Sequence, residues 1–241
     1  MAAFLRGYEG YSYSTFVWHD LLYNQPPEGL DIRLTLDLSL QEEVDNLLAG
    51  YQGAAIVMNA DTGEILAMAS HPYFDAANLD DNWETLISDE SAPLVNRATQ
   101  GNYPPGTSLS PFLLINNFNW LNNNQDATRI FSGPAIDLNC AINPQPEITW
   151  RSLIASGCQV IQSQFVDDVE NTTLLELYED LGFFTEPQLQ MIVAEAPSIT
   201  TISDKNDLLQ GEGSFAITPL QMALAASALT NTGVLPGPRI V

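Results

Sequence analysis

The stretch Tyr103-Pro104-Pro105-Gly106-Thr107-Ser108-Leu109-Ser110-Pro111-Phe112 guides the interpretation of the rest of the chain. Two prolines and a glycine predict a stiff turn, because proline fixes φ and glycine tolerates a reversal. Apolar residues then recur at roughly helical spacing, which predicts a buried helix beginning near Thr107. Thr107 and Ser110 lie three residues apart, so their hydroxyls share one face at the helix N-terminus, where developing negative charge is favoured. The stretch predicts either an ordinary core helix or the position of a nucleophile.

The composition excludes several classes of function. The chain has 241 residues and a formal net charge of −23, so it is large enough for one large domain or two small ones. Nucleic acid and anionic membrane surfaces would repel such a charge, so we expect neither as a partner. The apolar runs are shorter than a membrane span, and residues 1–6 lack a signal-peptide core. We therefore expect no membrane span in this chain.

Few residues are suited to metal or redox chemistry. Cys140 and Cys158 have a spacing that matches no zinc pattern, and either a disulfide or two buried thiols fits them. His19 and His71 have no ligand-like neighbours, so we interpret both as structural or surface residues. Lys205 is the single lysine, which restricts any lysine-dependent mechanism to that side chain. We expect no metal or cofactor.

The N-terminal part divides into an arm and the start of a domain. Aromatic residues concentrate before position 25, which predicts a packing arm or a short helix over 14–23. A Pro-Pro-Glu-Gly sequence breaks this segment, and alternation over 31–36 then predicts a half-buried strand. We therefore expect an aromatic arm over residues 1–30 and one domain over residues 31–241.

A helix and a hairpin are predicted next. Ser39 is expected to cap the helix, with Glu42 completing a capping box and Gly50 ending it. Two β-rich runs, 54–59 and 64–69, flank a four-residue turn that contains aspartate and glycine. This arrangement predicts an antiparallel hairpin.

Three further helices are expected, two of them from capping signals. We expect one over 149–156, one beginning at a Thr173–Glu176 capping box, and one capped by Thr218. The last helix has proline at its first turn and a glutamine in position to complete a capping box. Between 116 and 146 the chain is rich in Asn, Pro and Gly and predicts loops.

The opening stretch resembles the active-site motif of class B penicillin-binding proteins, which typically reads Tyr-Pro-Pro-Gly-Ser-Thr-Phe-Lys-Pro. The resemblance covers about residues 21–241 and is carried in chain order by these segments: Leu34-Thr35-Leu36-Asp37, Gly53-Ala54-Ala55-Ile56-Val57, Thr62-Gly63-Glu64-Ile65-Leu66-Ala67-Met68, Ser70-His71-Pro72-Tyr73-Phe74-Asp75, Asn96-Arg97-Ala98, Gly157-Cys158-Gln159-Val160 and Gly211-Glu212-Gly213 with Thr218-Pro219-Leu220-Gln221-Met222-Ala223. It implies an α/β (α+β) fold, in which a transpeptidase-like helical cluster packs against an antiparallel sheet.

The resemblance also implies where catalytic groups would stand. In the family a serine attacks a D-alanine carbonyl of a peptidoglycan stem peptide or a β-lactam, assisted by a lysine three residues later. Here Thr107 stands at the serine position and Ser110 at the lysine position. The second family motif, Ser-x-Asn, is replaced by Gly157-Cys158-Gln159. The Lys-Thr-Gly strand has no counterpart, so we expect a domain truncated before that strand and an incomplete sheet.

These departures predict a pseudoenzyme, because loss of a general base typically costs ~10²–10⁴-fold in rate. The resemblance implies a domain related to peptidoglycan D,D-transpeptidases, catalytically inactive, with altered catalytic positions Thr107, Ser110 and Gln159 and a binding or scaffolding role. It also implies stem peptides or cell-wall synthesis proteins as partners, no cofactor, and an extracytoplasmic location in the cell envelope.

Two alternatives remain open from sequence. One is a weak acyl-transfer or hydrolytic enzyme that uses Thr107 or Ser108, with a base supplied by Lys205, His71 or an acid. Ser108 is only the fallback nucleophile. A step of one residue along a helix turns its side chain by roughly 100° away from the face that carries Thr107 and Ser110. The other alternative is an incomplete fragment of a split or truncated transpeptidase.

Overall fold

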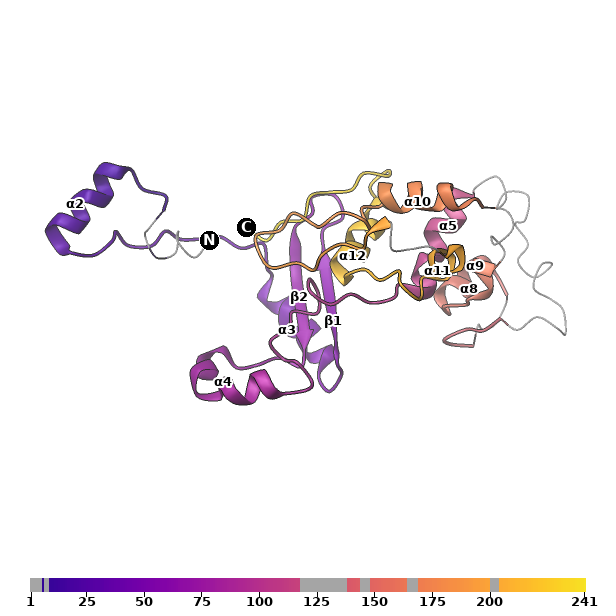
Figure 1. Ribbon diagram of the computed structural model, residues 1–241, viewed down its shortest axis with the longest axis horizontal. Coiled ribbons are helices and arrows are strands. Elements are labelled where there is room, and N and C mark those ends of the chain that lie inside the picture. Colours follow the sequence, from indigo (N-terminus) through magenta and orange to yellow (C-terminus); the bar gives the residue numbers. More distant parts are fainter. Residues whose placement is uncertain (1–5, 7–8, 118–137, 144–147, 164–168, 200–203) are drawn as a thin grey trace.

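A two-stranded sheet lies between a helical cluster and an N-terminal arm (Figure 1). The structure is a computed structural model and describes residues 6, 9–117, 138–143, 148–163, 169–199 and 204–241. Helices α5 and α8–α11 gather at one end of the molecule, α12 lies between them and the strands, and α2 stands apart at the other end. The expected α/β (α+β) architecture with an incomplete sheet is confirmed.

The sheet is the predicted hairpin. Strand β1 (Gly53–Met58) pairs antiparallel with β2 (Ile65–His71), with Ile56 opposite Met68 and an irregularity at Val57/Met58. Alternate residues of β2 are buried, as expected for a strand with one face against a core. Helix α3 (Leu38–Leu48) packs against the hairpin and α12 contacts β1, so the strands are held between helices.

The N-terminus of α3 differs from its prediction. Asp37, not Ser39, is the N-cap, and its carboxylate accepts hydrogen bonds from the backbone N–H groups of Ser39 and Leu40 at 3.0 and 3.2 Å. The Ser39 hydroxyl also donates to this carboxylate, and these bonds hold the pKa of Asp37 below its usual value. Because the carboxylate reaches both N–H groups, the helix starts earlier than the Ser39–Glu42 pattern indicated.

The predicted strand over 31–36 is wrong. The segment runs irregularly between β2 and the C-terminal stretch: Thr35 N–H donates to Ile240 O at 3.0 Å, and the Thr35 hydroxyl donates to Ile65 O at 2.5 Å. Next to it, Asp37 N–H donates to Leu66 O at 2.9 Å. This segment makes isolated hydrogen bonds to β2 and to the C-terminal stretch and does not form the continuous ladder of a strand. The alternation of apolar residues over 31–36 was therefore not sufficient to predict a strand.

The helical cluster surrounds an aromatic core. Its helices are α5 (Ser110–Asn116), α8 (Trp150–Ala155), α9 (Val160–Ser163), α10 (Asn171–Asp180), α11 (Lys205–Gln210) and α12 (Pro219–Ala228). Tyr178 stacks on Phe215 with ring centroids 5.0 Å apart, and Phe183 packs edge-on against Phe215. The Tyr178 hydroxyl donates to Leu208 O at 2.8 Å, which satisfies a fully buried phenol.

One of the two caps predicted in this cluster is confirmed: Thr218 caps α12 in a capping box with Gln221. The helix expected over 149–156 is present as α8, and Thr149 caps it in a capping box with Ser152 that had not been predicted. The Thr173–Glu176 capping box is wrong, because α10 begins two residues earlier, at Asn171. Its N-cap makes no side-chain hydrogen bond, so burial of the apolar side of the helix, rather than a cap, determines its extent.

The arm contains the predicted helix. Helix α2 (Tyr13–Tyr23) is capped by Ser12 and buries none of its side chains. Tyr11 anchors the arm to its own return segment by donating to Glu28 O at 2.8 Å. A short turn, η1 (Ala76–Asn78), and α4 (Leu79–Ser88) follow the hairpin. Across the described residues, no helix has the length and apolarity needed to cross a membrane.

Candidate active site

The Pro-Pro-Gly turn is held by the Gly211–Ile217 segment from the C-terminal third of the chain. Gly106 N–H donates to Gly211 O at 2.8 Å, and Tyr103 exchanges two backbone hydrogen bonds with Ile217, at 2.9 and 3.0 Å. A 3₁₀ turn, η2 (Gly106–Leu109), then leads into α5. The α-helix therefore begins at Ser110, three residues later than predicted, and the tighter turn carries Thr107.

The three hydroxyls in this turn and at the first residue of α5 occupy different environments. Thr107 is half-buried, and its hydroxyl makes no hydrogen bond to the described residues. Ser108 is exposed, and its hydroxyl donates to Pro105 O at 2.5 Å. Ser110 is 1% exposed, and its Oγ has no hydrogen-bond partner among the described residues. Ser110, which the resemblance aligns with the family's lysine, is therefore a buried hydroxyl without a partner among the described residues.

Gly157 faces Thr107 across the site. A Cβ atom added to Gly157 would lie 3.2 Å from Thr107 Oγ1 and 3.3 Å from Ala141 Cβ. Gly157 also has φ of 59°, a left-handed conformation that favours glycine. The fold thus brings together Thr107 and Gly157, which are 50 residues apart in sequence.

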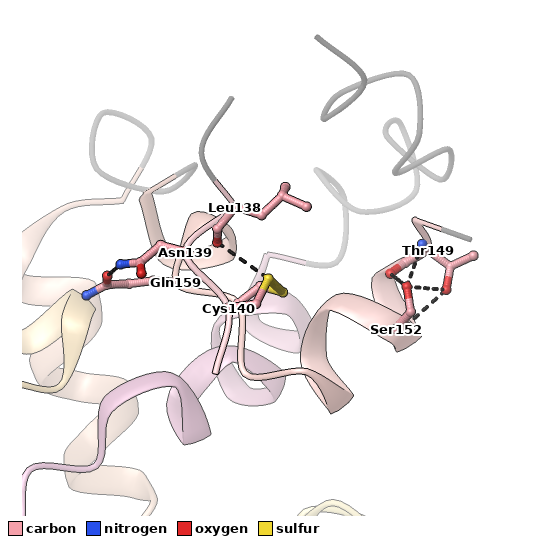
Figure 2. The surroundings of a disulfide bond; sticks show 7 residues. Leu138, Asn139, Cys140, Thr149, Ser152 and Gln159 are labelled. Carbon is pink, nitrogen blue, oxygen red and sulfur yellow. Dashed lines mark hydrogen bonds between the residues drawn. A yellow bond between two sulfur atoms is a disulfide. The ribbon is translucent and has the colours of Figure 1, made fainter. Parts of the chain in front are cut away.

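Gln159 is the centre of a polar chain beside this pair. Its Nε2 donates to Glu212 Oε1 at 3.0 Å, and its Oε1 accepts a hydrogen bond from Asn139 Nδ2 (Figure 2). Sequence reasoning missed Asn139, which lies in a stretch predicted as loop. Glu212 could have been found from the sequence, because it lies between Gly211 and Gly213 in one of the segments that resemble penicillin-binding proteins.

Gln162 supports the turn from behind. Its Nε2 donates to Gly106 O at 2.9 Å, while its Oε1 has no partner among the described residues, although the residue is fully buried. This residue follows the second motif by three positions and had no recognisable sequence signal. The amide fixes the carbonyl that precedes Thr107.

The cysteines are joined. Cys140 and Cys158 form a disulfide, which resolves the alternative left open by the sequence. Cys158 is the middle residue of the second motif and is fully buried. Among the described residues, no group of three or more His, Cys, Asp or Glu side chains could hold a metal ion.

The residues considered as alternative bases lie in other elements. His71 is buried at the end of β2, where its Nε2 lies 3.3 Å from Asp45 Oδ1 and its ring meets Tyr73 edge-on. This arrangement fits the structural role expected for His71. Lys205 is the first residue of α11, which is capped by Asp204 and packs against η2.

The penicillin binding protein transpeptidase domain model matches residues 53–241. The chain belongs to this family. The peptidoglycan D,D-transpeptidase MrdA of Haemophilus influenzae is 27% identical over 252 residues, covering 88% of this chain and 37% of that protein. The match therefore spans well under half of the relative's length.

Solved structures show the same fold. The penicillin G acyl-enzyme complex of penicillin-binding protein A from Mycobacterium tuberculosis superposes with a TM-score of 0.76 at 22% identity, covering all of this chain and 61% of that one. The complex between PBP2 and MreC from Helicobacter pylori gives a TM-score of 0.68 at 21% identity, covering 90% and 45% of the two chains. These likenesses support the fold, whereas activity depends on the side chains at the site.

Proposed function

We propose that the chain is a penicillin-binding-protein-like domain, related to peptidoglycan D,D-transpeptidases, that has lost acyl transfer and keeps a binding or scaffolding role in cell-wall synthesis. One observation carries this proposal: the Thr107 hydroxyl has no hydrogen bond to a described base, and the lysine position holds the buried hydroxyl of Ser110. A nucleophilic hydroxyl needs a group that takes its proton, and serine does not do this near neutral pH.

The second motif supports the same conclusion. Gly157 offers no side chain toward Thr107, so the hydroxyl that the family places there is absent. Gln159 is occupied by Asn139 and Glu212 rather than directed to Thr107. Because groups that act as one catalytic unit fail together, Thr107 alone supplies little of the family's rate.

Incubation with a fluorescent penicillin, followed by intact mass measurement, tests the proposal. We expect no stable mass increase for the wild-type chain, and the same result for Thr107→Ala. A covalent adduct mapped to Thr107, lost in Thr107→Ala, would overturn the loss of acyl transfer. Ser108→Ala is the matched control, since it removes a neighbouring hydroxyl whose hydrogen bond points back to Pro105.

A weak enzyme is the second candidate. Thr107 is half-buried, and its hydroxyl makes no hydrogen bond to the described residues. The Ser108 hydroxyl already donates a hydrogen bond to Pro105 O, so Thr107 is the better candidate for a nucleophile. This candidate predicts slow hydrolysis of an activated ester, abolished in Thr107→Ala and retained in Ser108→Ala. Equal rates in both variants and in the wild type would exclude Thr107 and Ser108 as nucleophiles.

A third candidate is an incomplete fragment of a split or truncated transpeptidase. Among the described residues, β1 pairs with β2 alone, and the matched relative is much longer than this chain. This candidate predicts weak protection in hydrogen exchange over residues 56–68. Strong protection there would count against it.

The partner and the location are further parts of the proposal. The PBP2 of Helicobacter pylori forms a complex with MreC, and we extend that class of partner, together with the peptidoglycan stem peptide, to this domain in the cell envelope. Residues 1–30 would then be an arm attached to the domain over 31–241, with the side chains of α2 available for contact. Binding to purified MreC, with and without residues 1–30, tests this part.

A further inference from the structure

The disulfide joins a short ribbon to the second motif. Cys158 lies between Gly157, which faces the Thr107 hydroxyl, and Gln159, which bonds to Glu212. Its partner Cys140 belongs to a segment, 138–142, that runs antiparallel to the motif. Figure 2 shows this ribbon, with Leu138, Asn139 and Cys140 beside Gln159. A change at the disulfide therefore acts directly on the residues that line the candidate site.

Apart from the disulfide, the ribbon is held by backbone hydrogen bonds and by the packing of Leu138 and Cys140 against the core of the helical cluster. Its backbone forms four bonds to the motif: from Ala141 N–H to Gly157 O at 3.3 Å, from Ile142 N–H to Ser156 O at 3.1 Å, from Gln159 N–H to Asn139 O at 3.0 Å and from Val160 N–H to Leu138 O at 3.4 Å. Two of these distances exceed the common range for N–H···O bonds. The disulfide closes a loop with a sequence separation of 18. It therefore limits the conformational entropy that the ribbon would gain if its hydrogen bonds broke.

The two sulfurs differ in access. Cys158 is fully buried, whereas Cys140 is only partly buried on the ribbon. Thiol–disulfide exchange requires a thiolate to reach one sulfur. An external reductant therefore meets Cys140 first, and Cys158 becomes the leaving thiolate inside the motif.

We propose that the Cys140–Cys158 disulfide is a redox-sensitive latch that holds the 138–142 ribbon, and with it the Gly157–Gln159 turn, against Thr107. A dithiol reductant attacks Cys140 Sγ, the Sγ–Sγ bond breaks, and Cys158 leaves as a thiolate that takes up a proton. The second thiol of the reductant then attacks the mixed disulfide and releases Cys140 as a thiol. The dithiol is oxidised to a disulfide and the protein is reduced by two electrons. The ribbon can then separate, and Gln159 loses Asn139.

Hydrogen exchange on the full chain before and after dithiothreitol treatment tests the latch. We expect two thiols to be released, counted by alkylation and mass. We expect amides in 138–143 and 156–160 to exchange roughly a hundredfold faster, equivalent to about 3 kcal/mol at ~1.4 kcal/mol per tenfold. Peptides over β1 and β2, residues 53–71, are expected to keep their protection and show that the fold persists.

A Cys140→Ser variant is the matched control. It should show the faster exchange without reductant and no response when reductant is added. If this variant fails to fold, reduction of the wild-type chain still decides the matter. Release of two thiols with unchanged exchange in 156–160 would overturn the proposal, as would a disulfide that resists dithiothreitol while 53–71 stays protected. The measurement does not involve acylation, so it is independent of the proposed loss of acyl transfer.

Discussion

Position 157 shows how one missing side chain shapes the site. Gly157 combines a positive φ of 59° with a close approach to Thr107, at 3.2 Å from an added Cβ. Gly53 has no positive φ, and an added Cβ there would meet nothing within 4 Å. The backbone conformation and surroundings of Gly157 therefore favour glycine, whereas those of Gly53 do not. The sequence alone does not distinguish the two positions.

Gly157→Ala should destabilise the chain, whereas Gly53→Ala should not. We expect Gly157→Ala to cost roughly 1–2 kcal/mol, because a Cβ is disfavoured in the left-handed region. Urea unfolding monitored by fluorescence measures the difference. Equal midpoints for the two variants would contradict the left-handed backbone conformation of Gly157.

Ser110 is the second test at the residue scale. Its buried hydroxyl has no partner among the described residues, so its desolvation is uncompensated. We expect Ser110→Ala to stabilise the chain by up to about 1 kcal/mol, or to be neutral. Thr218→Ala is the contrast, because that hydroxyl caps α12 and its loss should cost about 1 kcal/mol. Marked destabilisation of Ser110→Ala in urea unfolding would show that the hydroxyl has a partner.

At the scale of elements, one side chain of α3 closes part of the outer edge of β2. Gln41 accepts a hydrogen bond from Met68 N–H at 2.8 Å and donates one to Met68 O at 3.0 Å. Its amide thus occupies the place of a neighbouring strand. Asp37 N–H, which donates to Leu66 O, covers the same edge two residues earlier.

Replacing Gln41 by alanine should uncover this edge. We expect a loss of about 1–3 kcal/mol, because two partly buried backbone groups lose their partner. Faster exchange of the Met68 amide is the local readout. Gln52→Ala provides the control, since its exposed side chain makes a single 3.3 Å bond to Ser91 O. A similar effect from both variants would contradict the role of Gln41.

At the scale of the whole molecule, the aromatic core links α10 to the Gly211–Ile217 segment that supports the site. Tyr178 stacks on Phe215 and donates to Leu208 O, and burial raises the pKa of its phenol well above the usual 10.0. The folded state therefore keeps the proton at a pH at which the unfolded chain loses it. This contribution to stability is fully present below about pH 10 and falls as the pH rises further.

Alkaline unfolding tests this linkage. The free energy of unfolding of the wild-type chain should decrease between pH 9 and 11, with a steeper slope than in Tyr178→Phe. The variant should be less stable at pH 8, by about 1 kcal/mol, because the hydrogen bond to Leu208 O is lost. Parallel pH profiles would show that Tyr178 is not the group responsible.

The elements that sequence reasoning predicted are those fixed by local signals. The hairpin at 53–71 has an Asp-Gly turn between β-rich runs, and Thr218 has its proline and glutamine partners within three residues. The errors lie where distant groups compete. The segment 31–36 has strand-like alternation, but isolated bonds to Ile65 and Ile240 displace a ladder. At α3, Asp37 takes the cap because its carboxylate reaches two N–H groups at once.

By itself, the sequence determined the family frame and the identities of Thr107, Ser110 and Gly157, because motif residues close together in the chain carry their own turn and helix signals. The tertiary structure alone decided what those residues face. It placed Gly157 against the Thr107 hydroxyl, joined Cys140 to Cys158, and gave Gln159 its partners Asn139 and Glu212. These contacts join segments far apart in sequence, so they depend on the packing of the helical cluster rather than on local preference.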